Sequence, residues 1–139
     1  MKILYYFLLL LLLFQISYVD YKTYMIPLEY NLCLGLFAVG RLIYMRVQPA
    51  SFIAAALFMG TFLGAFCYLS RGEMLGGGDV KLMMAAGLLL GIRKVFFAFF
   101  MGCILASFLE GIRIKRGKAN RIFAMGPYLC IGIFCQIII

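Results

Sequence analysis

The chain has no histidine, and only five of its 139 residues are acidic. Histidine is the commonest metal ligand and the commonest general base near neutral pH. Any chemistry must therefore run on carboxylates, lysine, tyrosine or hydroxyl groups. The five cysteines form no Cys-x-x-Cys pair, which leaves a zinc site or a disulfide framework unsupported. We expect no metal and no cofactor.

Charged residues of any kind are also scarce, at 13% of the chain, whereas 66% of the residues are hydrophobic and the mean hydropathy is +1.07. A soluble core of this size could not hide so much apolar surface. The sequence therefore predicts an all-α integral membrane protein. We expect the lipid bilayer as a partner and no nucleic acid, and the oligomeric state stays open.

Apolar runs of membrane-spanning length divide the chain into a single transmembrane domain, residues 1–139, without a soluble domain. The first run is long and no small-x-small cleavage site follows it, so it is interpreted as a retained helix and not as a signal peptide. The predicted bundle has about six spans: 3–19, 28–44, 50–69, 80–92, 95–112 and 122–139.

The lysines and arginines indicate how this bundle is oriented. The turns after spans one, three and five hold eight of them, and the opposite side holds five. The positive-inside rule then places the first set in the cytoplasm and both termini outside. All five carboxylates lie on the same, cytoplasmic side, so an active site built from them would face the cytoplasm.

Two of these carboxylates, Asp20 and Asp79, stand at junctions between a span and a turn and have no evident structural role. An ionised carboxylate in hydrocarbon costs at least about 2.5–3.5 kcal/mol, so such a residue predicts function. Asp79 also ends the glycine run 76–78, and glycine lets a backbone approach a ligand closely.

The other three acids have ordinary explanations. Glu110 precedes Arg113 by three residues, which is the spacing of an ion pair on a helix. Glu73 stands beside Arg71 in a loop and can be solvated. Glu29 lies in the first turn of a predicted helix, where a carboxylate complements the helix dipole.

Two carboxylates in a partly dry site support a known chemistry. Like charges a few ångströms apart cannot both ionise cheaply, so the pair shares a proton. One member then activates water while the other donates a proton to the substrate carbonyl oxygen, as in aspartic proteases. This chemistry needs no histidine, which suits the composition.

Three motifs carry a resemblance to a known family. The chain has Asp20 followed seven residues later by Pro27, then Gly76-x-Gly78-Asp79 continued by Val80-Lys81-Leu82, and finally Met125-Gly126-Pro127-Tyr128. In this order they resemble the type IV prepilin peptidases and the archaeal preflagellin peptidases, which are Gly-x-Gly-Asp membrane aspartyl proteases.

The resemblance implies catalytic roles for Asp20 and Asp79 and an active-site loop formed by Gly76, Gly77, Gly78 and Lys81. It implies a substrate of pilin-like precursors (prepilins, pseudopilins or preflagellins), cut just after a short basic leader. Further residues near the motifs are expected to support the site or contact the substrate: Lys22, Pro27, Glu73, Gly126 and Pro127.

Lys81 has two interpretations that the sequence leaves open. Its ammonium could lie near Asp79, or it could be an ordinary lysine that snorkels to the headgroups at a helix start. The chain also begins almost at the first catalytic span and lacks the paired Cys-x-x-Cys motifs of larger relatives. We therefore expect cleavage without N-methylation, and S-adenosylmethionine is not implied.

Two other classes of function use the same aspartates. A small ion or proton carrier would bind its coupling cation there, although transporter sites usually lie near the membrane midplane. A scaffold for pilus assembly would tolerate substitution of either residue by asparagine.

Overall fold

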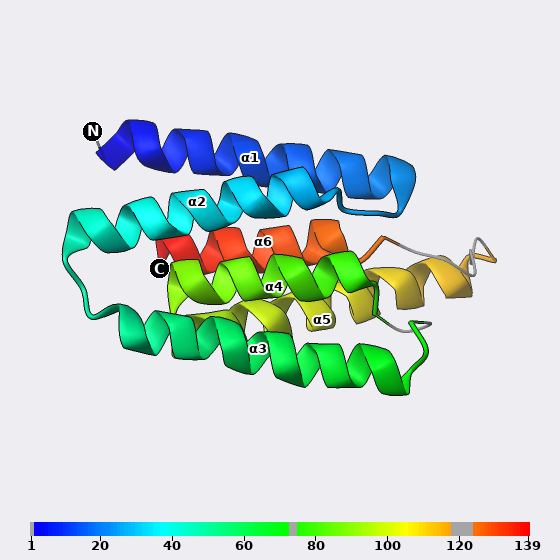
Figure 1. Ribbon diagram of the computed structural model, residues 1–139. Coiled ribbons are helices and arrows are strands. Elements are labelled where there is room, and N and C mark those ends of the chain that lie inside the picture. Colours follow the sequence, from blue (N-terminus) through cyan, green and yellow to red (C-terminus); the bar gives the residue numbers. More distant parts are fainter. Residues whose placement is uncertain (1, 73–74, 118–123) are drawn as a thin grey trace.

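The computed structural model describes residues 2–72, 75–117 and 124–139 (Figure 1). In this part of the chain every element is a helix, so the prediction of an all-α protein with about six helices is confirmed. The helices are α1 (Lys2–Thr23), α2 (Leu28–Met45), α3 (Pro49–Leu69), α4 (Gly77–Leu90), α5 (Ile92–Lys115) and α6 (Gly126–Ile138).

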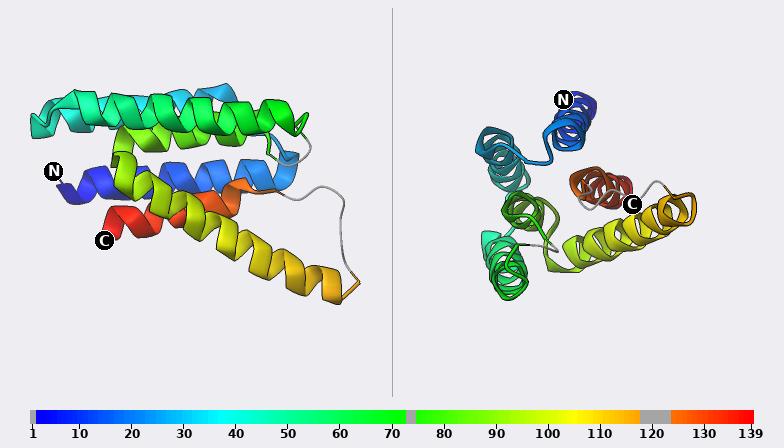
Figure 2. Two further views of the ribbon diagram at one scale, coloured as in Figure 1. Left: turned by 90° about the horizontal axis from the view of Figure 1, so that it is seen from below. Right: turned by 90° about the vertical axis from the view of Figure 1, so that its right-hand side faces the viewer.

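Successive helices run in opposite directions along one bundle, and the two chain ends lie at the same end of it (Figure 1). The helix α4 is central, because it packs against α2, α3, α5 and α6 (Figure 2). It is also the helix with the most buried residues. The helix α5 leans away from the others toward its C-terminal end (Figure 2).

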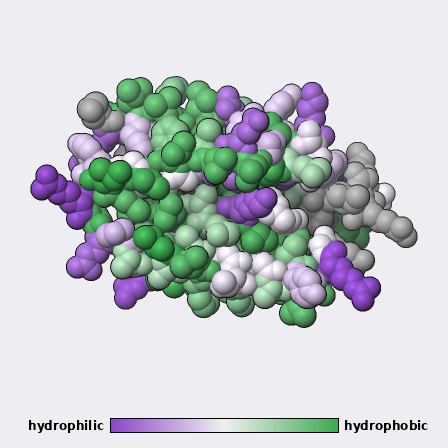
Figure 3. Space-filling view, viewed as in Figure 1, coloured by the Kyte–Doolittle hydropathy of each residue, from purple (hydrophilic) through white to green (hydrophobic). Residues whose placement is uncertain are grey.

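Four helices are long and apolar enough to cross a membrane: α1, α2, α3 and α5. The helices α4 and α6 have 14 and 13 residues, which correspond to about 21 and 20 Å against about 30 Å of hydrocarbon. Hydrophobic side chains cover much of the face seen in Figure 3; hydrophilic ones gather toward its two ends, and a few lie within it. The outer surface is therefore that of a membrane protein.

Glycines allow the short helices to pack closely against their neighbours. A β-carbon at Gly87 on α4 would lie 3.1 Å from the carbonyl carbon of Ala55 on α3. A β-carbon at Gly132 on α6 would overlap the carbonyl oxygen of Ala98 on α5. These contacts between backbones replace side-chain packing, as is common in membrane bundles.

Two helix boundaries differ from the sequence prediction in ways that matter for function. The helix α1 continues to Thr23, so Asp20 lies within it and not at a junction. The helix α4 begins at Gly77, so Gly77, Gly78 and Lys81 are helical, where a loop was predicted. The carbonyl of Gly76 starts this helix by accepting hydrogen bonds from the amides of Asp79 and Val80.

Candidate active site

Asp20 is buried in the last turns of α1, with 4% of its surface exposed. Its Oδ2 accepts a buried hydrogen bond of 2.8 Å from the amide of Gly126, a residue 106 positions later in the chain. Gly126 is the first residue of α6. Since the N-terminus of a helix carries free amides and partial positive charge, it stabilises an anion at this point.

Gly126 is required sterically at this contact. A β-carbon there would overlap the Asp20 carboxylate. Pro127 follows as the second residue of α6, where the missing amide of proline costs no helical hydrogen bond. The Gly-Pro pair therefore starts α6 and brings its first amide against Asp20.

Asp79 is the third residue of α4 and has 8% of its surface exposed. Its Oδ2 lies 3.5 Å from the position that a β-carbon of Gly76 would take, so the carboxylate turns back toward the start of the helix. Its Oδ1 is buried and has no hydrogen-bond partner among the described residues. A buried acceptor without a partner is costly, which indicates that water, a proton or a substrate group completes this site.

The two carboxylates belong to one site. Asp20 lies against the start of α6 and Asp79 lies in the first turn of α4, and α4 and α6 pack against each other. Both carboxylates are buried within the bundle. Within the described ranges the one ion pair is that of Glu110 with Arg113. The groups beside the two aspartates are therefore the positive ends of α4 and α6, and not side-chain cations.

The glycines beside Asp79 have distinct environments. A β-carbon at Gly78 would lie 3.1 Å from the β-carbon of Ile26, so glycine there allows α4 to approach the start of α2. Gly76 and Gly77 are exposed, and a β-carbon at Gly77 would meet nothing within 4 Å. The first turn of α4 is therefore an open backbone surface next to a buried carboxylate.

Both lysines expected near the site lie outside it. Lys81 is exposed whereas Asp79 is buried, because residues two apart on a helix point in different directions. No ion pair joins Lys81 to Asp79 within the described residues. Lys22 is likewise exposed, two residues after Asp20.

The remaining expected residues have separate positions. Pro27 caps the start of α2 and is half-buried. Glu73 lies outside the described residues. The ion pair of Glu110 with Arg113 is confirmed at 2.9 Å, and the hydroxyl of Tyr128 donates to the same Glu110 oxygen at 3.2 Å.

Asn31 on α2 is a residue that the sequence reasoning missed. It has 6% of its surface exposed, and neither polar atom of its side-chain amide has a partner among the described residues. It shares a buried helix face with Leu34 and Ala38. The start of α2, where Asn31 lies, is at the end of the bundle that holds the dyad of Asp20 and Asp79 (Figure 1). The available signal was an amide side chain four residues after Pro27 in an otherwise apolar helix.

No group of three or more potential metal ligands gathers anywhere in the described part of the chain. The site therefore consists of two carboxylates, two helix starts, an open glycine turn and unpaired polar atoms. Two neighbouring carboxylates can hold one shared proton and position a water molecule.

Comparisons with known proteins agree with the motifs. A family model described as the type IV leader peptidase family matches residues 7–110, a range that contains both aspartates and the glycine run and ends before Gly126. The chain is similar to the prepilin leader peptidase/N-methyltransferase of Vibrio cholerae serotype O1, with 29% identity over 105 residues. This alignment covers 68% of the chain and 40% of the relative. No solved structure gives a significant match.

Proposed function

This chain belongs to the type IV leader peptidase family, and on that premise we propose that it is a membrane aspartic endopeptidase. Its proposed substrates are prepilins, pseudopilins or preflagellins, from which it removes the short basic leader peptide. The observation that carries the proposal is the buried pair of Asp20 and Asp79, of which Asp79 lies in the first turn of α4 and Asp20, near the end of α1, lies against the first amide of α6. The methyltransferase activity named in the relative is not part of the proposal.

The proposed reaction needs only the two carboxylates and water. The pair holds one proton, since two neighbouring negative charges repel each other. The ionised carboxylate takes a proton from water, the water oxygen attacks the carbonyl carbon of the scissile peptide, and the protonated carboxyl group donates its proton to the carbonyl oxygen. Transfer of a proton to the peptide nitrogen then lets the carbon–nitrogen bond break.

The open first turn of α4 supports a route for the substrate. An extended peptide passing Gly76 and Gly77 would bring its carbonyl to Asp79 without meeting a side chain of either residue. The buried amide of Asn31 offers a free donor and a free acceptor at the same end of the bundle. We propose that these groups bind the peptide backbone around the scissile bond.

The test is co-expression with a pilin-like precursor, read as a size shift on a gel. We expect Asp20→Asn and Asp79→Asn each to lower the cleavage rate by about a thousandfold, because loss of an acid or base typically costs about 10²–10⁴-fold. Glu29→Gln removes an exposed carboxylate at the same end of the bundle and is the matched control. Normal cleavage by a well-inserted Asp79→Asn variant would refute the protease and redirect the work to the carrier or the scaffold. Ion flux into vesicles would then test the carrier.

We further propose that the site faces the cytoplasm from the cell membrane and that both termini lie outside. The arginine and lysine bias supports this orientation. A reporter fused to the C-terminus checks it, since alkaline phosphatase should be active there and a fluorescent protein should not be. The reverse pattern would place the dyad at the outer face.

A further inference from the structure

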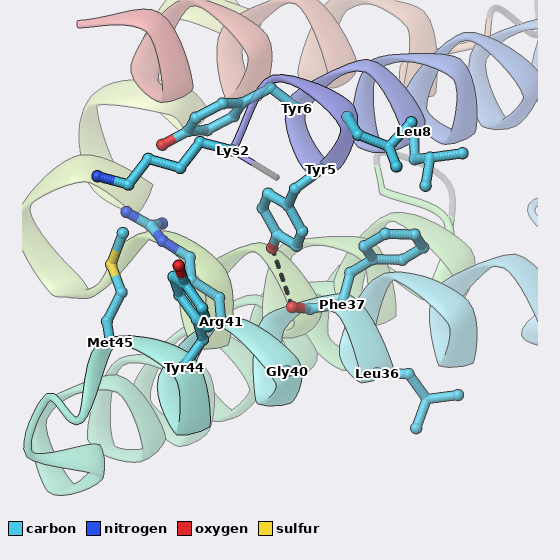
Figure 4. Close-up of a pocket in the computed structure, with 11 residues that line it drawn as sticks. Lys2, Tyr5, Tyr6, Leu8, Leu36, Phe37, Gly40, Arg41, Tyr44 and Met45 are labelled. Atoms are coloured by element: carbon cyan, nitrogen blue, oxygen red, sulfur yellow. Dashed lines mark hydrogen bonds between the residues drawn. The ribbon is translucent and has the colours of Figure 1, made fainter.

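A cavity of about 520 Å³ lies between the start of α1 and the end of α2, at the opposite end of the bundle from the aspartates (Figure 4). Its size is within the range of small-molecule sites. Eleven residues line it: Lys2, Leu4, Tyr5, Tyr6, Leu8, Leu36, Phe37, Gly40, Arg41, Tyr44 and Met45.

The lining is divided into a cationic end and an apolar end. Figure 4 shows the ammonium of Lys2 and the guanidinium of Arg41 on the same side of the cavity, where the hydroxyl groups of Tyr6 and Tyr44 also lie. Leu8 and Leu36 lie away from these groups. No acidic residue lines the cavity, so the two positive charges are not balanced within it.

The positions along the helices match those of a membrane lipid. Lys2 begins α1 and Tyr44 lies in the last turn of α2, whereas Leu8 lies about 9 Å further along α1 by helical rise. Arg41 is fixed in place because its Nη1 donates a 2.7 Å hydrogen bond to the carbonyl of Leu89. The remaining guanidinium donors are available for a phosphate group.

We propose that this cavity binds one phospholipid with an anionic headgroup. The phosphate lies between Lys2 and Arg41, the tyrosine hydroxyls donate to its oxygens, and an acyl chain fills the apolar end beside Leu8 and Phe37. The bound lipid covers the seam between α1 and α2 where the two helices separate, and it does not take part in peptide cleavage.

The test uses the full chain purified in detergent and mixed with equal amounts of phosphatidylglycerol and phosphatidylcholine, with bound lipid counted by native mass spectrometry. We expect one phosphatidylglycerol per protein, bound in preference to phosphatidylcholine by about fivefold or more. A preference of about fivefold is what one cation near an anionic headgroup provides. Lys2→Gln should lower this preference about fivefold. Arg93→Gln removes an exposed cation at the same end of the bundle but outside the cavity, so it should leave the preference unchanged.

A second pair of variants tests the cavity itself. A β-carbon at Gly40 or at Gly35 would meet nothing within 4 Å, so both positions on α2 have room for the start of a side chain, but of the two only Gly40 lines the cavity. We expect Gly40→Leu to abolish retention of phosphatidylglycerol and Gly35→Leu to retain it. Equal retention of the two lipids by the wild type, or retention by Gly40→Leu, would overturn the proposal. A dimer lost in Gly40→Leu would instead assign the cavity to a second copy of the chain.

Discussion

The two ends of the bundle differ in whether their buried polar groups have hydrogen-bond partners. At the end with the aspartates, three buried side-chain atoms have no partner among the described residues: Asp79 Oδ1 and both polar atoms of the Asn31 amide. At the other end, side chains reach across helices to bind backbone carbonyls. These bonds join Tyr5 to Phe37, Arg41 to Leu89 and Lys94 to Gln136.

The contrast follows the two short helices. Each has a carboxylate at its N-terminal end, Asp79 on α4 and Asp20 against α6. Each has a cation at its C-terminal end, where Arg41 binds Leu89 of α4 and Lys94 binds Gln136 of α6. Both arrangements complement the helix dipoles. The difference is that side chains of the protein bind the backbone carbonyls at the C-terminal ends of α4 and α6, whereas the carboxylate end keeps buried polar atoms without a described partner, which is expected where a substrate supplies the missing partners.

Among variants that keep both aspartates, the largest effect should come from filling the contact between Asp20 and the start of α6. Gly126→Ala places a β-carbon where the carboxylate lies, so the carboxylate must move. A displacement of about 1 Å in a catalytic group can lower the rate about a hundredfold. We expect a loss of that size in cleavage of the pilin-like precursor, read from its size on a gel.

Gly111→Ala is the control for this substitution, because it adds a methyl group to α5 where nothing lies within 4 Å. Cleavage by Gly126→Ala at the rate of Gly111→Ala would mean that the contact of Asp20 with α6 does not position the carboxylate for catalysis.

A smaller effect, on stability, is expected at the opposite end. Arg41→Gln removes the donor to the carbonyl of Leu89, a residue that is 1% exposed. An unpaired buried carbonyl costs about 1–3 kcal/mol, which lowers the melting temperature by several degrees. Cleavage per folded molecule should not change, because Arg41 lies at the far end from the dyad. Equal melting temperatures for Arg41→Gln and Arg93→Gln would show that this hydrogen bond does not hold α4 in place.

The sequence could predict the helices and the residues of the site, but not their orientation within the bundle. Composition is sufficient for an all-α membrane protein, and the motifs around Asp20, Asp79 and Gly126 are distinctive although the chain places them far apart. Which face of a helix turns inward is harder to predict, because the lipid-facing side is as apolar as the core. That is why the sequence left two interpretations of Lys81 open, and why Asn31 was overlooked.

The start of α4 was missed for a different reason. Three glycines disfavour helix in general, which led to the prediction of a loop over residues 76–78. The close approach of Gly78 to Ile26 and the capping carbonyl of Gly76 override that preference. Both are contacts that exist only in the folded bundle.

The smallest expected change would show whether the unpaired groups at the dyad end are reserved for substrate. Asn31→Leu replaces a buried amide without partners by an apolar side chain of similar size, so the protein should become more stable, by about 1 kcal/mol or more. If the amide binds the peptide backbone, the same substitution lowers kcat/KM about tenfold, the loss of one such hydrogen bond. Gly35→Leu, on the same helix, is the control. Higher stability with unchanged cleavage would mean that Asn31 contacts no substrate, and lower stability would mean that a bound water satisfies the amide.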